Sequence, residues 1–213
     1  MSPIDGVRPD SKFERLAREK RFQGRVVGVS TDRMILPNDV EVVHEVVHLP
    51  DAVCVVPLIE SGDGTEVVLV EQFRGALSGH IYEIPAGILE KGEAPAACAA
   101  RELAEETGYR AAKVTPLTVL CPTPGTSSHR MHFFLAEELT PGTAQLEPAE
   151  CLRVEQIDFD NLLTSLLRSE PTTSDDGVVV VDAKTHLALL HVAWLREGKT
   201  GGGEASHAGV GEP

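Results

Sequence analysis

The stretch from Gly87 to Tyr109 reads Gly-Ile-Leu-Glu-Lys-Gly-Glu-Ala-Pro-Ala-Ala-Cys-Ala-Ala-Arg-Glu-Leu-Ala-Glu-Glu-Thr-Gly-Tyr. It contains a turn followed by a helix: Lys91-Gly92-Glu93 is typical of a turn, and Pro95 suits a first helical turn. Gly108 suits the position just past a helix end, where a left-handed backbone conformation is common. The pattern therefore predicts a helix from Ala94 to Thr107.

Three glutamates of this predicted helix share one face. Glu102, Glu105 and Glu106 are spaced i, i+3, i+4, which brings them together at about 100° per residue. Like charges at this spacing destabilise a helix by about 0.2–0.5 kcal/mol per pair, so a bound cation explains them best. A hard divalent ion with oxygen ligands fits three carboxylates, whereas a solvated acidic face is the alternative. The opposite face, expected to pack against a sheet, carries Ala100, Leu103, Ala104 and Thr107.

The same stretch resembles the Nudix box, G-x5-E-x7-R-E-U-x-E-E-x-G-U with U apolar, at every specified position. The fixed letters fall on Gly87, Glu93, Arg101, Glu102, Glu105, Glu106 and Gly108, and the apolar ones on Leu103 and Tyr109. This resemblance implies hydrolysis of a phosphate anhydride with Mg²⁺, or Mn²⁺, as cofactor. It also implies that Glu93 and Arg101 fix the loop and orient a carboxylate. An ordinary surface ion pair is the alternative for those two residues.

The resemblance implies roles for residues inside and outside the box. Because the helix glutamates are committed to metal, a general base or extra ligand is expected from the loop Leu146–Val154. Glu150 is the first candidate and Glu147 the second, and a merely acidic loop is the alternative. The expected catalytic residues are Arg101, Glu105, Glu106, Glu147 and Glu150. The expected metal ligands are the Ala86 carbonyl, Glu102, Glu105, Glu106 and Glu150.

Other segments resemble the ADP-ribose pyrophosphatase and nucleotide-sugar branch of this family. They are Glu71-Gln72-Phe73-Arg74, Tyr82–Gly87, and Pro124, which stands fifteen residues beyond Tyr109. An arginine such as Arg74 can give a diphosphate two parallel hydrogen bonds. The substrate contacts expected from this branch are Arg74, Glu83, Ile88, Pro124 and His129.

The match to that branch departs from the usual pattern after Pro124. Relatives often read Gly-x-Ser-x-Glu-Arg there, whereas this chain has Ser127-Ser128-His129-Arg130, with His129 in the place of the acid. ADP-ribose hydrolysis to AMP and ribose 5-phosphate is the predicted reaction. GDP-mannose or another nucleotide sugar, an RNA end or damaged nucleoside triphosphate, and a non-catalytic nucleotide-binding regulator are the alternatives.

The composition limits which binding partners and which cellular compartment are expected. The formal net charge of −14 over 213 residues argues against binding to a nucleic-acid backbone. The four cysteines form no CxxC pair, so neither a disulfide framework nor a zinc site is expected. With no signal peptide and no apolar run of membrane length, we expect a cytoplasmic protein that does not bind membranes.

The predicted fold is α/β, a Nudix-type α/β/α sandwich with a mixed sheet and a small β-rich subdomain in front of it. The predicted divisions are 1–50, 51–198 and a flexible tail, 199–213. In the first, residues 11–22 are expected to form a short helix, followed by a hairpin with its turn at Leu36–Asp39. By resemblance, this subdomain is expected to join two copies in a homodimer, with exchange between subunits possible.

Overall fold

The computed structural model describes residues 10, 12–62, 64–146, 151–168, 172–174, 177–179 and 181–198. Its body is one mixed sheet of seven strands, ordered β10-β5-β4-β9-β8, with β6 paired to β5 and β7 to β4. Only the β4–β9 pairing is parallel among those of this sheet. The strands are β4 (Ala52–Ser61), β5 (Gly64–Arg74), β6 (Gly79–Glu83), β7 (Ala86–Ile88), β8 (Arg110–Leu120), β9 (Met131–Thr140) and β10 (Leu152–Asp158).

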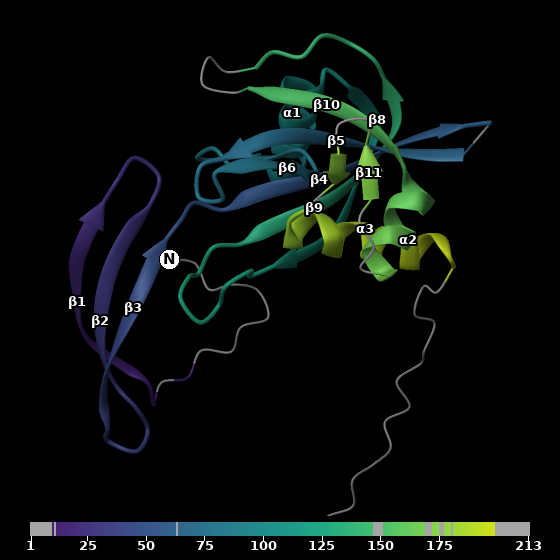
Figure 1. Cartoon of the computed structure of the whole chain (residues 1–213). Helices are drawn as coiled ribbons and strands as arrows, with labels where there is room; N and C mark the ends of the chain where they lie inside the picture. Colours follow the sequence, from purple (N-terminus) through teal and green to yellow (C-terminus); the bar gives the residue numbers. More distant parts are fainter. Residues whose placement is uncertain are drawn as a thin grey trace, which may run out of the picture.

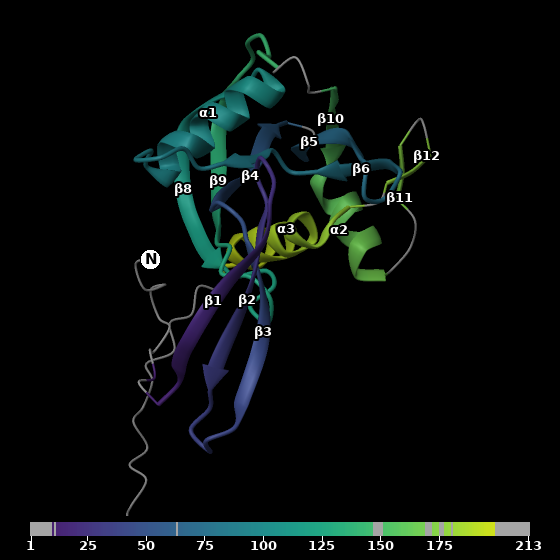
Figure 2. The same ribbon diagram turned by 90° about the vertical axis from the view of Figure 1, so that its left-hand side faces the viewer.

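Helices cover both faces of this sheet (Figures 1 and 2). Helix α1 (Pro95–Thr107) lies on one face, and α2 (Phe159–Arg168) and α3 (Ala183–Arg196) lie on the other. The short strands β11 (Thr172–Ser174) and β12 (Gly177–Val179) pair with each other. The predicted α/β/α sandwich with a mixed sheet is therefore confirmed.

Strand β4 shows why the sheet is buried on both sides. Its apolar residues run without interruption, as expected for a strand that has no solvent face. Because successive side chains alternate, Val53 and Val55 pack with α1, whereas Cys54 and Val56 pack with α2 and α3. Each fully buried aliphatic side chain of this kind contributes about 1.5–3 kcal/mol. This core holds the strands that carry the cavity described below.

Helix α1 begins and ends as its sequence predicts. Pro95 stands in the first turn, and Gly108 adopts a left-handed conformation with φ 78° at the C-terminal cap. The predicted buried face is partly wrong, since Ala100 is exposed and Ala104 only half-buried. The buried face consists of Cys98, Ala99, Glu102, Leu103, Glu106 and Thr107. The helix is rotated in this way because two of its glutamates are tucked against the backbone of β7.

The N-terminal region is a three-stranded antiparallel sheet, ordered β1-β2-β3: β1 (Glu14–Gln23), β2 (Gly28–Ile35) and β3 (Glu41–His48). The predicted helix over residues 11–22 is wrong, because this segment forms β1 and pairs with β2 along its length. Local helix propensity gives way to tertiary pairing, in which Arg18 makes two hydrogen bonds to Asp32 at 2.7 and 2.5 Å. The predicted turn at Leu36–Asp39 is confirmed by the hydrogen bond from Asp39 N to Leu36 O.

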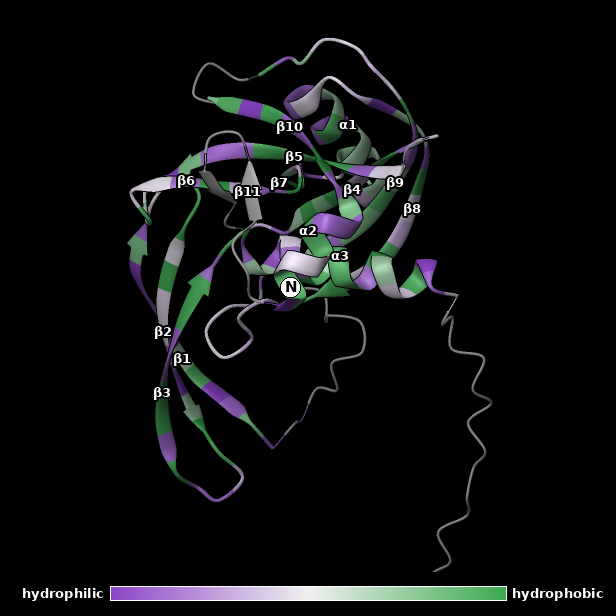
Figure 3. Ribbon diagram, turned by 45° about the vertical axis from the view of Figure 1, so that its right-hand side comes forward, coloured by the Kyte–Doolittle hydropathy of each residue, from purple (hydrophilic) through white to green (hydrophobic). Residues whose placement is uncertain are grey.

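This sheet projects away from the body, as Figures 1 and 2 show. Figure 3 shows apolar and polar residues alternating along its strands. Several large apolar side chains on it are exposed: Phe13, Leu16, Phe22, Val26, Val27, Val40 and Val43. The bridge between Val47 and Ser127 ties β3 to the loop that follows β8.

The division at residue 50 stays a prediction, and the predicted tail lies outside the described residues. None of the described helices is long and apolar enough to cross a membrane.

Candidate active site

A cavity of about 530 Å³ lies beside the C-terminal half of α1. One side of it is formed by β7 and α1, through Ala86, Gly87, Ile88, Arg101, Glu102, Glu105 and Glu106. The other side is formed by Gln72 and Arg74 of β5, together with Arg25 from the connection between β1 and β2. The lining therefore combines the carboxylates of α1 with arginines from α1, β5 and the β1–β2 connection.

The carboxylates of the α1 side are held close to the β7 backbone. Glu106 accepts a hydrogen bond from the Ala86 N–H at 3.1 Å. Glu102 lies so near Gly87 that a Cβ there would come within 1.9 Å of its carboxyl carbon. The missing side chain of Gly87 therefore makes room for this glutamate.

Arg101 links the glutamates of the turn and the helix. Its side chain contacts Glu93 at 2.9 Å, Glu102 at 2.8 Å and Glu105 at 2.8 Å. The hydrogen bonds from Arg101 lower the pKa of Glu93 to about 2, so this carboxyl stays ionised at neutral pH. The pair predicted between Glu93 and Arg101 thus exists, and it also reaches the proposed metal ligands.

Cys98 lies beside this network without being reactive. Its sulfur is 3.6 Å from the Ile88 carbonyl oxygen and 3.3 Å from Arg101 Nη2. Burial raises the pKa of the thiol to about 12, which keeps it protonated. Cys98 is therefore a packing residue of α1, and all four cysteines are free.

Arg74, which lines the cavity, is held by the buried carboxylate of Glu83. Arg74 binds Glu83 through both Nε and Nη2, the latter at 2.8 Å from Oε2. Lys184, from the first turn of α3, binds the same Glu83 oxygen and also Asp182 at 2.6 Å. Burial works against ionisation of Glu83, but the hydrogen bonds and charges of Arg74 and Lys184 outweigh it and hold its pKa below the usual value.

The residues present suit a divalent metal ion. Glu102 and Glu106 are buried carboxylates and Glu105 lines the same cavity, which is the oxygen-rich donor set that hard cations prefer. Within the described part of the chain, however, no three acidic, imidazole or thiol groups converge closely enough to form a ready-made site. Arg101 and the Ala86 N–H hold the carboxylates instead. Glu102, Glu105, Glu106 and Ala86 are the residues that would hold an ion.

The predicted site residues are distributed unevenly around this cavity. Arg74, Ile88 and the residues of α1 line it, whereas Glu83 lies behind Arg74. Pro124 and His129 do not line it; the His129 ring contacts the Pro50 carbonyl at 2.6 Å, at the junction with the N-terminal sheet. Glu147 and Glu150 lie outside the described residues.

Sequence reasoning missed three side chains here: Arg25, Gln72 and Lys184. Gln72 stood within the Glu-Gln-Phe-Arg segment and could have been found there. Arg25 and Lys184 carried no signal, because only the fold brings the β1–β2 connection and the start of α3 toward β5 and β6.

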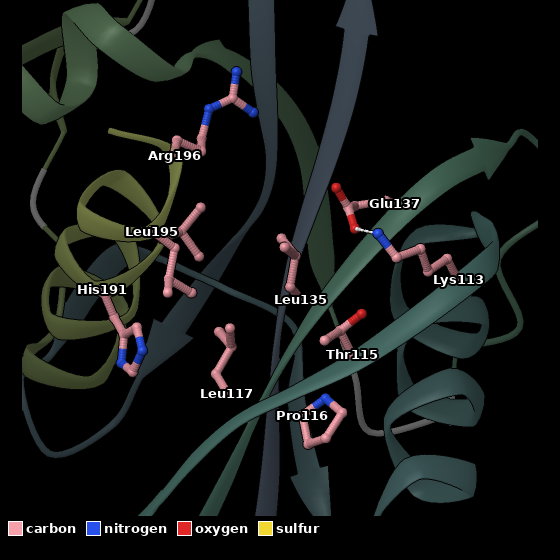
Figure 4. Close-up of a pocket in the computed structure, with 10 residues that line it drawn as sticks. Lys113, Thr115, Pro116, Leu117, Leu135, Glu137, His191, Leu195 and Arg196 are labelled. Atoms are coloured by element: carbon pink, nitrogen blue, oxygen red, sulfur yellow. Dashed lines mark hydrogen bonds and ion pairs between the residues drawn. The ribbon is translucent and has the colours of Figure 1, made fainter. Parts of the chain in front are cut away.

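A second cavity, of about 500 Å³, lies between α3 and strands β8 and β9 (Figure 4). Its floor is apolar, with Leu117, Leu135 and Leu195. Its charged residues are already paired, Lys113 with Glu137 at 2.6 Å and Arg196 with Glu60 at 2.5 Å. This cavity therefore offers no cluster of reactive groups.

The fold and the cavity define a class of protein. The chain is similar to a crystal structure of an ADP compounds hydrolase, with a TM-score of 0.75 and 23% identity, covering 91% of this chain and 99% of that one. At this identity the likeness shows the fold alone. Residues 48–196 match the model of the NUDIX domain, and the chain belongs to the Nudix family.

Relatives in sequence agree with this assignment. An ADP-ribose pyrophosphatase of Bacillus subtilis (strain 168) is 36% identical over 179 residues, covering 83% of this chain and 90% of the relative. A methanol dehydrogenase activator of Bacillus methanolicus is 34% identical over 175 residues, covering 81% and 93%. An ADP-sugar pyrophosphatase of Mus musculus is 33% identical over 151 residues, covering 66% and 67%.

Proposed function

We propose that this protein hydrolyses the diphosphate bond of a nucleoside diphosphate sugar, with ADP-ribose as substrate and AMP and ribose 5-phosphate as products. The observation that carries the proposal is the cavity itself, which is lined by Glu102, Glu105 and Glu106 of the Nudix box together with Arg74. The names of the Bacillus subtilis and Mus musculus relatives support this substrate class.

In the proposed reaction, a water oxygen forms a bond to one phosphorus and the bond from that phosphorus to the bridging oxygen breaks. The bridging oxygen leaves with the other phosphate, and the proton released by the water passes to a general base. Glu150, with Glu147 in reserve, stays the proposed base. Arg74 gives the diphosphate a fixed cation. Pro124 and His129 lie outside the cavity, so they are proposed to contact only a part of the sugar or nucleotide that extends beyond it.

Nudix hydrolases use divalent metals, and we propose Mg²⁺ as the ion, with Mn²⁺ as a substitute. Bound Mg²⁺ neutralises the diphosphate and lowers the pKa of a coordinated water. Glu102 and Glu106 are the proposed direct ligands, and Glu105 and the Ala86 carbonyl complete the set. Arg101 keeps Glu102 and Glu105 in place by its contacts at 2.8 Å.

We also propose that two copies associate through the N-terminal sheet. Its apolar side chains are exposed in the single chain, with Val43 at 62%, and such a surface favours a protein interface. Val43→Asp is expected to yield a monomer in light scattering, whereas Val119→Asp, at an exposed position of β8, is expected to leave the dimer intact. A dimeric Val43→Asp protein would contradict this interface.

We propose the cytoplasm as the compartment, because the four cysteines are free thiols and the cytoplasm is reducing.

GDP-mannose is the second candidate substrate. A GDP-mannose pyrophosphatase of Citrobacter koseri is 40% identical over 86 residues, covering 38% of this chain and 44% of the relative. His129, in the place where relatives often carry an acid, also leaves the sugar preference open. A regulator that binds the nucleotide without hydrolysing it is the remaining alternative.

Chromatographic product analysis tests these proposals. The purified protein is incubated with ADP-ribose, GDP-mannose, diadenosine polyphosphates or dGTP, with Mg²⁺, Mn²⁺ or a chelator, beside Glu106→Gln. AMP formed from ADP-ribose, and lost with chelator and in the variant, is the expected result. GMP from GDP-mannose instead would change the substrate, and binding without any turnover would favour the regulator.

A further inference from the structure

Four charged side chains form a chain of contacts that runs from α3 to the cavity: Asp182, Lys184, Glu83 and Arg74. Lys184 Nζ contacts Asp182 at 2.6 Å and also binds Glu83 Oε2. Glu83 in turn receives two hydrogen bonds from Arg74, which lines the cavity. The start of α3 is therefore connected to the proposed diphosphate-binding arginine through one carboxylate.

Because Glu83 is buried and Lys184 is largely buried, their charges must compensate each other. The Glu83 side chain is 3% exposed and that of Lys184 11%, whereas the Arg74 side chain is 42% exposed. A buried carboxylate needs compensating charge, and the four residues together carry two positive and two negative charges. Without Lys184, the cluster would hold one excess negative charge beside the place proposed for an anionic substrate.

Contacts made by the neighbours of Lys184 hold it beside β6 and Ile84. The Thr185 hydroxyl accepts a hydrogen bond from Ile84 N at 3.0 Å, and a bridge pairs Tyr82 with Val181. Asp182 caps α3 by accepting a hydrogen bond from Thr185 N at 3.0 Å. The first turn of α3 is thus fixed to the strand that carries Glu83, so Lys184 reaches the carboxylate from a defined position.

We propose that Lys184 is a positioning residue for substrate binding, which acts through Glu83 to hold Arg74 in the orientation that receives the substrate diphosphate. This inference rests on the proposed function. Glu83 occupies Nε and Nη2 of Arg74, and among the described residues no partner holds Nη1. Lys184 shares the charge of Glu83 and fixes its carboxyl group, so that the orientation of the Arg74 guanidinium, which lines the cavity, depends on Lys184.

A double-mutant cycle tests the proposal. Lys184→Met is expected to raise KM for the nucleotide sugar roughly 10-fold, with kcat within about 3-fold, because a charge-assisted hydrogen bond is lost from the binding side. Arg74→Met is expected to raise KM at least as much. The double variant should match Arg74→Met within about 2-fold, since Lys184 has nothing to position once Arg74 is absent. If the KM increase of the double variant equals the product of the increases in Lys184→Met and Arg74→Met, the proposal is overturned.

The same helix supplies a matched control. Arg196, at the other end of α3, anchors the helix to β4 through Glu60 at 2.5 Å and to β5 through Thr65 at 2.7 Å (Figure 4 shows Arg196). Arg196→Met should lower the Tm without changing KM. Lys184→Arg should restore KM to within about 3-fold of wild type, because it keeps the charge. If Lys184→Met does not fold, Lys184→Gln replaces it. A KM that changes equally in the Arg196 variant would mean that Lys184 acts only on stability.

An NMR measurement that needs no catalytic turnover tests the role of Lys184 independently of the proposed function. In NMR spectra, the Arg74 Nε–H signal, identified by its loss in Arg74→Met, should be sharp in wild type and broadened or shifted in Lys184→Met. An unchanged signal overturns the positioning role even if the enzyme hydrolyses ADP-ribose. A changed signal in a protein that hydrolyses no nucleotide sugar leaves the coupling of Lys184 to Arg74 standing and removes the proposed function.

Discussion

On the acidic side of the cavity, the charged side chains come from one short stretch, residues 90–106, and Arg101 links Glu102 and Glu105 to Glu93 of the preceding turn. On the opposite side, Arg74, Glu83 and Lys184 come from β5, β6 and α3. The first arrangement depends on helix geometry and one turn. The second depends on the packing of a helix against a sheet, with Glu83 and Lys184 separated by 101 residues.

This difference indicates how the two sides should respond to substitution. Changes on the acidic side are expected to reduce kcat, because that side holds the proposed metal ligands. Changes on the arginine side are expected to raise KM, because that side is proposed to bind the diphosphate. The predictions that follow run from the largest expected effect to the smallest.

Glu106→Gln should lower kcat at least about 10³-fold, because a lost ligand to a catalytic metal removes several kcal/mol of transition-state stabilisation. The fold should persist, which circular dichroism checks beside steady-state kinetics. Glu137→Gln, a carboxylate of β9 paired with Lys113 at 2.6 Å, is the matched control and should retain full activity. A fully active Glu106→Gln variant would show that the acidic side is not the catalytic one.

Gly87→Ala should lower kcat roughly 10- to 100-fold while leaving the Tm nearly unchanged. The added Cβ would lie within 1.9 Å of the Glu102 carboxyl carbon, and this flexible side-chain end can move aside without disturbing the core. Metal affinity measured by calorimetry should fall in parallel. Gly62→Ala, where a Cβ meets nothing within 4 Å, serves as the control. Unchanged metal affinity in Gly87→Ala would contradict a ligand role for Glu102.

Arg74→Lys tests the other side with the charge kept. Lysine cannot reproduce the two hydrogen bonds that Arg74 makes to Glu83, so KM should rise about 10-fold with kcat little changed. Substrate saturation curves measure both constants. A fall in kcat at constant KM would mean that the two sides of the cavity do not divide binding and catalysis as proposed.

Glu93→Gln is expected to have the smallest effect, a Tm within about 2 °C of wild type, since the carboxylate belongs to a turn whose other two residues, Lys91 and Gly92, are exposed. Arg101 lowers the Glu93 pKa from 4.5 to about 2, so its contribution is complete above pH 4.5. The contribution is lost as pH falls through about 2. The Tm values of the two proteins should therefore differ by a constant amount from pH 8 to 5. The difference should begin to shrink below pH 4.5 and vanish as the pH falls through about 2. Convergence already at neutral pH would contradict the depressed pKa.

Much of the fold was predictable because its signals are local. The helix of the box has a proline at its start and a glycine at its end, and both have the expected positions in the structure. The segment 11–22 was mispredicted because its charged pattern suits a surface helix, whereas its partner strand β2 determines its structure. The buried face of α1 was partly misplaced because the three glutamates were all expected on the face opposite the sheet, whereas Glu102 and Glu106 belong to the buried face.

The amino-acid order alone was enough to predict the Nudix box, its three glutamates and the sandwich around them, since spacing along one helix places those residues together. The arginine side needed the tertiary structure. Lys184 and Arg25 are ordinary surface cations by sequence, and nothing near them predicts their partners. They approach the cavity because α3 packs beside β6 and because the β1–β2 connection reaches β5. Contacts between distant segments follow from packing of the whole chain, which no local pattern encodes.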